Sequence, residues 1–362
     1  MRFSHRSLQI LKYLRAVPSA KQVSNTIIGD IPEPSPQQSS YDLGPFERRP
    51  ISSVSDRPNG WIRQFTGNLR LEYGTGCVYK GFRPIFNSTD GLHVNSPFAV
   101  PTRPISVFRQ DCIEIDEAIV LWSMYQRNYY HFLFDYVPKL EIVERAGISS
   151  RIPVIVAEDL ASLKHYIEAA ELGLFGPRKI VIQEKHQCIR ARRLYVVKPD
   201  VYTKRQLGFP MHRLGRRPDP TSRDRIYVSR GGESFNNRQI LNEKDLAARL
   251  RPLGFEVIVP GTMPLAAQID RFARAGIVVG PHGGGLANIL FRYGAPMALV
   301  EMINDTKRYI HHFFNIATHC GFFYRATLNR AEPVDEGKAP AHADIEAVLG
   351  AVEEAIAWEK SN

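Results

Sequence analysis

The second half of the chain alternates between short apolar runs and amphipathic stretches. Apolar runs bounded by Gly or Pro predict buried strands, whereas apolar residues at i, i+3 and i+4 spacing predict helices. The expected strands cover residues 225–229, 255–259, 276–279, 297–301 and 322–324. The expected helices cover residues 243–253, 265–275, 286–291, 308–320 and 343–360. Because parallel strands need crossover connections, this alternation predicts a parallel sheet covered by helices.

The first half is less regular, and a length of 362 residues is enough for two domains. Its first 60 residues are rich in Pro, Ser and Arg, which is typical of an extension, and residues 61–102 suggest hairpins or irregular β structure. Strands are expected at 116–122, 153–157 and 194–197, a helix at 160–173 and a linker at 198–223. The predicted organisation is an extension over 1–60, α/β domains over 61–205 and 206–335, and a C-terminal helix over 340–362.

The stretch from Asn128 to about residue 146 predicts an amphipathic helix with Asn128 as its N-cap and an interruption at Pro138. His131 and Asp135 lie one turn apart and therefore share a face near the start of this helix. Such a pair either forms a hydrogen bond that only stabilises the helix, or supplies a general base with its carboxylate partner.

Residues 277–288 change character in their middle. Three β-branched residues are followed by Gly280, Pro281, His282 and three glycines, and then by apolar residues at helical spacing. A strand, a glycine turn and a helix start in succession form a site for an anion such as phosphate, with His282 as a donor. The alternative is a tight turn without a ligand. The run matches neither the dinucleotide fingerprint nor a P-loop.

Polar residues also follow two other expected strands of the second half. Arg230 comes after the first strand, with Arg238 eight residues on, and Glu301 ends the fourth. Because ligands bind at the carboxyl ends of parallel strands, the two arginines are candidates for phosphate contacts and Glu301 for both hydroxyls of a ribose. The alternative is a salt bridge between Arg230 and Glu301. Asn242 and Asp245 resemble a capping box for the helix at 243–253.

Composition limits the kinds of partner that the protein is expected to bind. The net charge of +10 favours anionic ones, of which nucleic acid is the weakest candidate because no basic and aromatic motif appears. No run of 18 apolar residues and no secretory signal is evident, so a cytoplasmic location is expected. The four widely spaced cysteines are expected to be reduced core thiols without zinc: Cys77, Cys112, Cys188 and Cys320.

Several ordered motifs together resemble glycosyltransferase family 61. They are residues 227–230, Arg238 with 240–243, residues 253–257, residues 279–288, residues 300–302, and the segment 128–140 with its Asn, His, Asp and Pro. The resemblance covers roughly residues 115–325 and departs from the usual pattern at Gly285. It implies a GT-B fold, in which two Rossmann-like domains face each other across a crevice. Bacterial members commonly occur in capsular or exopolysaccharide synthesis, and eukaryotic members transfer xylose or N-acetylglucosamine.

The resemblance therefore implies an inverting glycosyltransferase that moves a sugar from a nucleotide-sugar donor to a glycan acceptor in surface polysaccharide synthesis. The first domain would supply the acceptor side and the catalytic residues His131 and Asp135, either of which could be the base. The second would bind the nucleotide-sugar through these residues: Arg230, Arg238, His282, Gly283, Gly284, Asn288 and Glu301. No Asp-x-Asp pair occurs, so no obligatory metal or other cofactor is expected.

Two other functions fit the same residues. A non-catalytic nucleotide- or glycan-binding component of a polysaccharide assembly complex would keep the crevice and need no base. A Rossmann oxidoreductase is disfavoured by the missing fingerprint. Peripheral association with an anionic membrane, at the inner face, or with other polysaccharide-assembly proteins is a further expectation from the basic charge.

Overall fold

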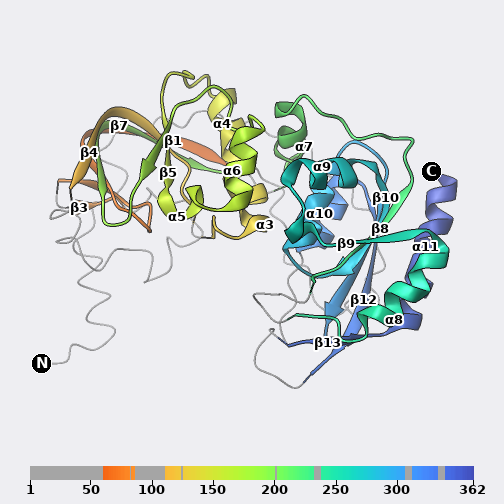
Figure 1. Ribbon diagram of the computed structural model, residues 1–362. Helices are drawn as coiled ribbons and strands as arrows, with labels where there is room; N and C mark the ends of the chain where they lie inside the picture. Colours follow the sequence, from red (N-terminus) through yellow and green to blue (C-terminus); the bar gives the residue numbers. More distant parts are fainter. Residues whose placement is uncertain are drawn as a thin grey trace, which may run out of the picture. The chain divides into compact units, whose positions relative to one another are not determined.

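The computed structural model describes residues 60–81, 83–85, 111–123, 125–199, 202–231, 238–305, 312–332 and 339–362. The described chain divides between residues 201 and 202 into two compact units, called unit 1 and unit 2 here (Figure 1). The predicted extension over residues 1–60 lies outside the described residues except for Gly60.

Unit 2 is built on a six-stranded sheet of order β13-β12-β11-β10-β8-β9. Five strands are parallel, and the short β13 pairs antiparallel with β12 at one edge. The strands are β8 (Asp224–Val228), β9 (Phe255–Ile258), β10 (Ala275–Pro281), β11 (Ala298–Asn304), β12 (Phe323–Ala331) and β13 (Ala341–Ala343). All five predicted strands are confirmed, and only the three-residue β13 was missed.

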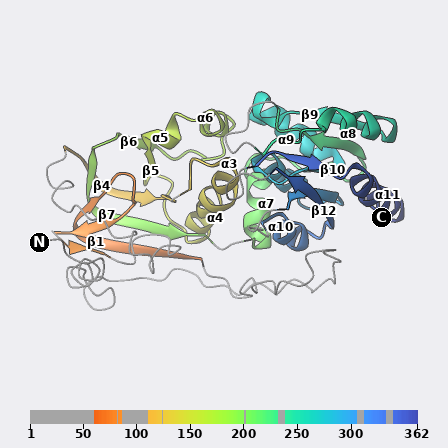
Figure 2. The same cartoon turned by 90° about the horizontal axis from the view of Figure 1, so that it is seen from below.

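Helices cover both faces of this sheet. Their bounds are α7 (Lys204–Arg213), α8 (Glu243–Leu250), η4 (Arg251–Leu253), η5 (Pro260–Thr262), α9 (Leu265–Arg274), η6 (Gly284–Arg292), α10 (His312–Cys320) and α11 (Ile345–Ser361). Apolar residues of α8 and α11 pack with Tyr227, Ile277 and Val300 of the strands in one buried cluster. The opposite layer contains α7, α9, η6 and α10, with η6 in contact with the other three (Figures 1 and 2).

Unit 1 is built on a seven-stranded sheet of order β3-β2-β1-β7-β4-β5-β6. The strands are β1 (Trp61–Leu71), β2 (Val78–Lys80), β3 (Arg83–Pro84), β4 (Cys112–Val120), β5 (Val154–Ala157), β6 (Ile180–Gln183) and β7 (Cys188–Lys198). Strands β7, β4, β5 and β6 are parallel, and β1 adds to β7 antiparallel. The helices are α3 (Tyr129–His131), η3 (Phe132–Tyr136), α4 (Pro138–Arg145), α5 (Glu158–Ala161) and α6 (Lys164–Glu171). The predicted α/β class with two Rossmann-like units is confirmed.

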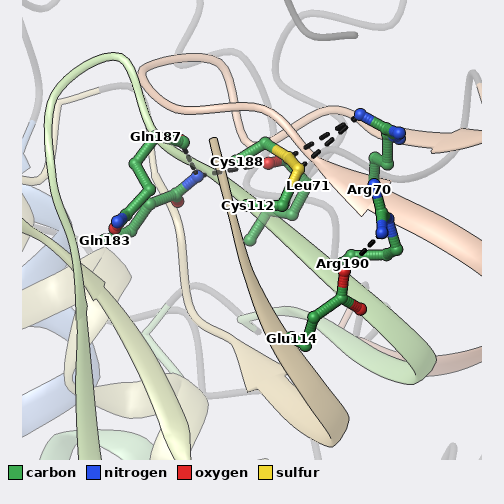
Figure 3. Close-up of a disulfide and its surroundings, with 8 residues drawn as sticks. All are labelled: Arg70, Leu71, Cys112, Glu114, Gln183, Gln187, Cys188 and Arg190. Atoms are coloured by element: carbon green, nitrogen blue, oxygen red, sulfur yellow. Dashed lines mark hydrogen bonds and ion pairs between the residues drawn. A yellow bond between two sulfur atoms is a disulfide. The ribbon is translucent and has the colours of Figure 1, made fainter. Parts of the chain in front are cut away.

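Two of the four cysteines form a disulfide, so the prediction of reduced thiols is wrong for Cys112 and Cys188. The two are register partners at the first positions of the adjacent parallel strands β4 and β7. The Arg70 guanidinium points toward both sulfurs, with Nη1 3.6 Å from the Cys112 Sγ (Figure 3). The pairing could not be seen in the sequence, because β7 returns beside β4 only after two intervening strands. Cys77 and Cys320 are not disulfide-bonded.

Two local predictions in unit 2 are also wrong. The expected linker at 198–223 contains α7, which Thr203 caps at Gln206 and which buries an apolar face including Phe209 and Met211. Asn242 does not cap α8 through its side chain. Its amide instead bonds both the N–H and the C=O of Ala343, and so ties the start of α8 to β13.

His165 of α6 lies among aromatic side chains, with its ring centroid 4.9 Å from that of Phe132 and 5.5 Å from that of Tyr129. Burial disfavours the imidazolium and lowers the pKa of His165 from 6.5 to about 4. Between these values the unfolded chain binds more protons than the folded one. The contribution to stability, roughly 3 kcal/mol, is therefore complete above pH 6.5 and is lost as the pH falls toward 4.

We expect His165→Gln to flatten this pH dependence. Urea unfolding at about pH 7.5 and about pH 4.5 would show a smaller fall in the free energy of unfolding for the variant than for the native chain. His212→Ala is a suitable control because His212 is exposed on α7. Equal falls in all three proteins would contradict the assignment to His165.

Candidate functional site

The strand order of unit 2 reverses between β8 and β10. The chain runs from β8 outward to β9 on one side, then returns to β10 and continues to β11 and β12 on the other. In open α/β sheets the carboxyl ends of the strands at such a point hold the ligand. Ser229 and Arg230 follow β8, and His282 and Gly283 follow β10. The sheet therefore brings together Arg230 and His282, two of the residues that the sequence singled out.

His282 is held by the neighbouring strand β11. Its backbone N–H donates to the Met302 carbonyl at 2.9 Å, and its Nδ1 lies 2.5 Å from Glu301 Oε1. Glu301 is fully buried, and its Oε2 accepts a hydrogen bond of 2.7 Å from the Tyr324 hydroxyl on β12. Both carboxylate oxygens are thus engaged within the protein. The alternative salt bridge between Arg230 and Glu301 is not formed, because Glu301 pairs with His282 instead.

Arg230 is fixed beside the same turn. Its Nη1 donates to the His282 carbonyl at 2.8 Å. A Cβ on Gly283 would overlap the Arg230 guanidinium, and one on Gly280 would lie 2.9 Å from the Cβ of Val228. A side chain at 280 would therefore clash with strand β8, and one at 283 would displace the Arg230 guanidinium, a packing reason for glycine separate from any ligand.

The charges around this turn favour an anion. Burial and the positive charge of Arg238 lower the pKa of Arg230 to about 10, and burial also lowers the pKa of Arg238. Both guanidinium groups still carry their charge at pH 7, although each is partly removed from water and they repel one another. Two partly buried positive charges near one another favour a nearby anion, which is the electrostatic character of a phosphate site.

The loop after β8 is held by a carboxylate, Glu243, for which the sequence predicted no role. Glu243 at the start of α8 accepts hydrogen bonds of 3.0 Å from the hydroxyls of Tyr227 and Ser229. The Ser229 Oγ also accepts from the N–H of Gly231, whose φ is 60°. Residues 227–230 and 240–243 both belong to motifs that carry the family resemblance, but Glu243 lies 14 residues beyond Ser229 and nothing local indicates their contact.

Asn288 and the helix after the glycine turn differ from expectation. The helix η6 is a 3₁₀ helix, not an α-helix. Asn288 is fully buried, and its Nδ2 donates to the Gln268 Oε1 at 2.8 Å and the Gly285 carbonyl at 3.1 Å. These bonds hold η6 to α9. Asn288 was predicted to bind the nucleotide-sugar, but in the structure its side-chain amide forms hydrogen bonds inside the protein.

Unit 1 has its own reversal of strand order, between β4 and β7. The chain leaves the carboxyl end of β4 through Leu121 and Trp122 and enters α3 at Asn128. The buried Lys139 of α4 donates from Nζ to the carbonyls of Leu121 at 3.2 Å and Trp122 at 2.6 Å. These two hydrogen bonds hold the start of α4 against the end of β4. The carboxyl end of such a strand is where open sheets bind ligands.

His131 and Asp135 are in direct contact, with the Nδ1 of the imidazole 2.5 Å from Oδ2 of the carboxylate. Their side chains are 23% and 13% exposed, so both are accessible from solvent. The helix is capped as predicted, because the Asn128 side chain accepts from the N–H of Tyr130. It then continues as the π-helix η3, in which Val137 N–H donates to the Phe132 carbonyl, before Pro138 begins α4.

The π-helical turn places His131 and Asp135 at a feature that is frequent at functional sites. The predicted interruption at Pro138 is thus confirmed in a specific form. Tyr125, which sequence reasoning did not single out, is 50% exposed and lies with its ring centroid 4.9 Å from that of His131. An exposed aromatic ring beside a His and a carboxylate gives this site an apolar surface for a ligand.

Among the residues that the structure describes, no group of three or more His, Cys, Asp or Glu side chains could hold a metal ion. Metal-independent binding remains a prediction. No helix in the described ranges is both long and apolar enough to cross a membrane.

Residues 129–306 match the protein family described as Glycosyltransferase 61. This range contains His131, Asp135, Arg230, His282 and Glu301. A solved structure described as E. coli heptosyltransferase WaaC with ADP-2-deoxy-2-fluoro heptose is similar, at 10% sequence identity and a TM-score of 0.32, over 66% of this chain and 99% of that chain. We found no match among curated proteins.

Proposed function

We propose that this chain, which contains a glycosyltransferase family 61 domain over residues 129–306, transfers a sugar with inversion from a nucleotide-sugar to a glycan acceptor. The observation that carries the proposal is the cluster of Arg230, Arg238 and His282 at the β8–β10 reversal of unit 2. Departure of a nucleoside diphosphate develops negative charge, and fixed cations at that position stabilise it. We therefore assign unit 2 to the donor.

The acceptor side is proposed for unit 1. Inversion in a single displacement requires a base that removes the proton of the acceptor hydroxyl. His131 is the proposed base, because its Nδ1 is engaged by Asp135 while the ring remains partly exposed. Asp135 would orient the imidazole and stabilise its protonated form. The exposed ring of Tyr125 would receive an apolar face of the acceptor sugar.

A nucleotide-sugar screen tests this function. Purified protein would be incubated with UDP-, GDP-, CDP- and ADP-linked sugars, with and without oligosaccharide acceptors, and release of free nucleotide and the product's anomeric configuration would be measured. We expect one donor to release nucleotide faster with acceptor present and to give an inverted linkage. Tight nucleotide binding without any transfer would favour the non-catalytic binding component instead.

We expect transfer to continue in EDTA. Because the chain has no Asp-x-Asp pair, Arg230, Arg238 and His282 would stabilise the negative charge of the leaving diphosphate without a metal. The initial rate with the best donor should stay within about twofold after EDTA treatment, with a known manganese-dependent transferase as control. A complete loss that manganese restores would contradict this assignment.

Surface polysaccharide, such as a capsule or exopolysaccharide, is the acceptor class that we propose, with peripheral membrane association supported by the basic net charge. The expected cytoplasmic location stays a prediction. The Cys112–Cys188 disulfide argues against it, because disulfides are rare in reducing compartments.

A further inference from the structure

Tyr324, Glu301 and His282 form a hydrogen-bonded series. This series suggests that Glu301 has another role than the ribose contact that the sequence predicts. A carboxylate that binds a ribose needs at least one oxygen open to the ligand. Glu301 is fully buried, and both oxygens are already used, one by Tyr324 and one by His282. Its action on a ligand must therefore pass through another residue.

His282 is the residue through which it can act. With Nδ1 facing Glu301, the free position of the ring is Nε2, and within the described ranges no protein group forms a hydrogen bond with that atom. The ring is 17% exposed and is held from another side by Phe313, whose centroid lies 5.1 Å away at a steep angle. Its orientation is thus fixed on two sides, with one nitrogen left for a ligand.

The charges around His282 determine which form of its ring is favoured when a diphosphate binds. A buried carboxylate is costly unless it is paired, and an imidazolium is a better partner for Glu301 than a neutral ring. A bound diphosphate adds negative charge on the other side of the ring, so Glu301 on one side and phosphate on the other both favour the protonated ring.

We infer that Glu301 and Tyr324 are positioning residues that hold His282 so that it takes up a proton when a diphosphate binds and donates Nε2–H to it. This rests on the proposed donor site of unit 2 and extends it. The proton comes from solvent, moves to Nε2 as the nucleotide enters, and leaves with the product. Strands β11 and β12 supply Glu301 and Tyr324, and His282 directly follows β10.

Calorimetry measures this proton directly. Binding of UDP, GDP, CDP and ADP would be compared at about pH 8, where nucleotide phosphates are already deprotonated, in buffers of different ionisation enthalpy. For the tightest nucleotide we expect net proton uptake by the native chain. Glu301→Gln should weaken binding about tenfold and remove most of the uptake, because the amide cannot balance an imidazolium. Tyr324→Phe should give an intermediate loss, and serves if Glu301→Gln fails to fold.

Glu359→Gln is the matched control. Glu359 of α11 is another nearly buried carboxylate of unit 2, paired at 2.8 Å with Arg225. It should leave nucleotide affinity and proton uptake unchanged. The inference is overturned if Glu301→Gln binds like the native chain with the same uptake, if both Gln variants lose affinity equally, or if the native chain binds no nucleoside diphosphate. A native chain that shows the expected binding pattern but transfers no sugar would overturn the proposed enzyme and support this inference.

Discussion

Replacing His131 by alanine should lower turnover about a hundredfold or more, while nucleotide affinity stays within about twofold. The alanine removes the imidazole that would accept the acceptor's proton. It leaves Asp135 without its partner at 2.5 Å and alters none of the unit 2 residues that we assign to the donor. Initial rates at saturating donor and acceptor, with calorimetry of the nucleotide, measure the two effects separately.

Asp135→Asn distinguishes the two candidate bases. If His131 is the base, the asparagine preserves much of the geometry and costs less activity than His131→Ala. If Asp135 is the base, the order of the two losses reverses. His212→Ala, on an exposed position of α7, should leave the rate unchanged. Near-normal turnover in His131→Ala, or loss of nucleotide binding by that folded variant, would contradict the assignment of His131 as the base.

Removing the disulfide should have the largest effect on stability. Cys112 and Cys188 are 76 residues apart, and closing a loop of that length restricts the unfolded chain by about 4 kcal/mol in the chain-entropy account. We expect the Cys112→Ala, Cys188→Ala double variant to lose stability of this order in denaturant unfolding. Since the bond joins β4 to β7, unit 1 should be the part that unfolds earlier.

Reductant provides the control for that measurement. Without reductant, the native chain should have a higher free energy of unfolding than the double variant. With the bond reduced, most of this difference should disappear. Thiol titration of the denatured native chain should give two free thiols, those of Cys77 and Cys320. Four thiols in protein alkylated at lysis, with no effect of reductant on stability, would show that the bond does not form in the cell and would support the cytoplasmic expectation.

The parts of the fold that the sequence predicted depend on local signals. Asn128 caps its helix through its own side chain, Pro138 interrupts the helix and begins α4, and apolar runs between glycines become strands of the second sheet. The proximity of Arg230 and His282 also followed, because each comes directly after a strand and parallel strands end at one edge.

The parts that it missed depend on partners distant in the chain. Glu301 was assigned to a ribose because it was expected to end a strand. In the structure β11 continues to Asn304, and Tyr324, which takes one of the Glu301 oxygens, lies on the next strand. Asn242 has the residue pattern of a cap, yet Ala343, a hundred residues on, uses its side chain. Glycine composition at 283–285 suggested room for a ligand, and at Gly283 the space is filled by Arg230.

The outermost strands of the two sheets differ in how well they resist pairing with another molecule. In β9 the charge of Glu256, held by Arg271, interrupts the edge of the unit 2 sheet. In β6 three β-branched residues run from Ile180 to Ile182, and Ile182 is 48% exposed. An exposed apolar edge is a template for intermolecular strand addition, and a charged one is not. Of these two edges, β6 is therefore the one at which self-association of concentrated protein is expected, and a lysine at position 182 should reduce it.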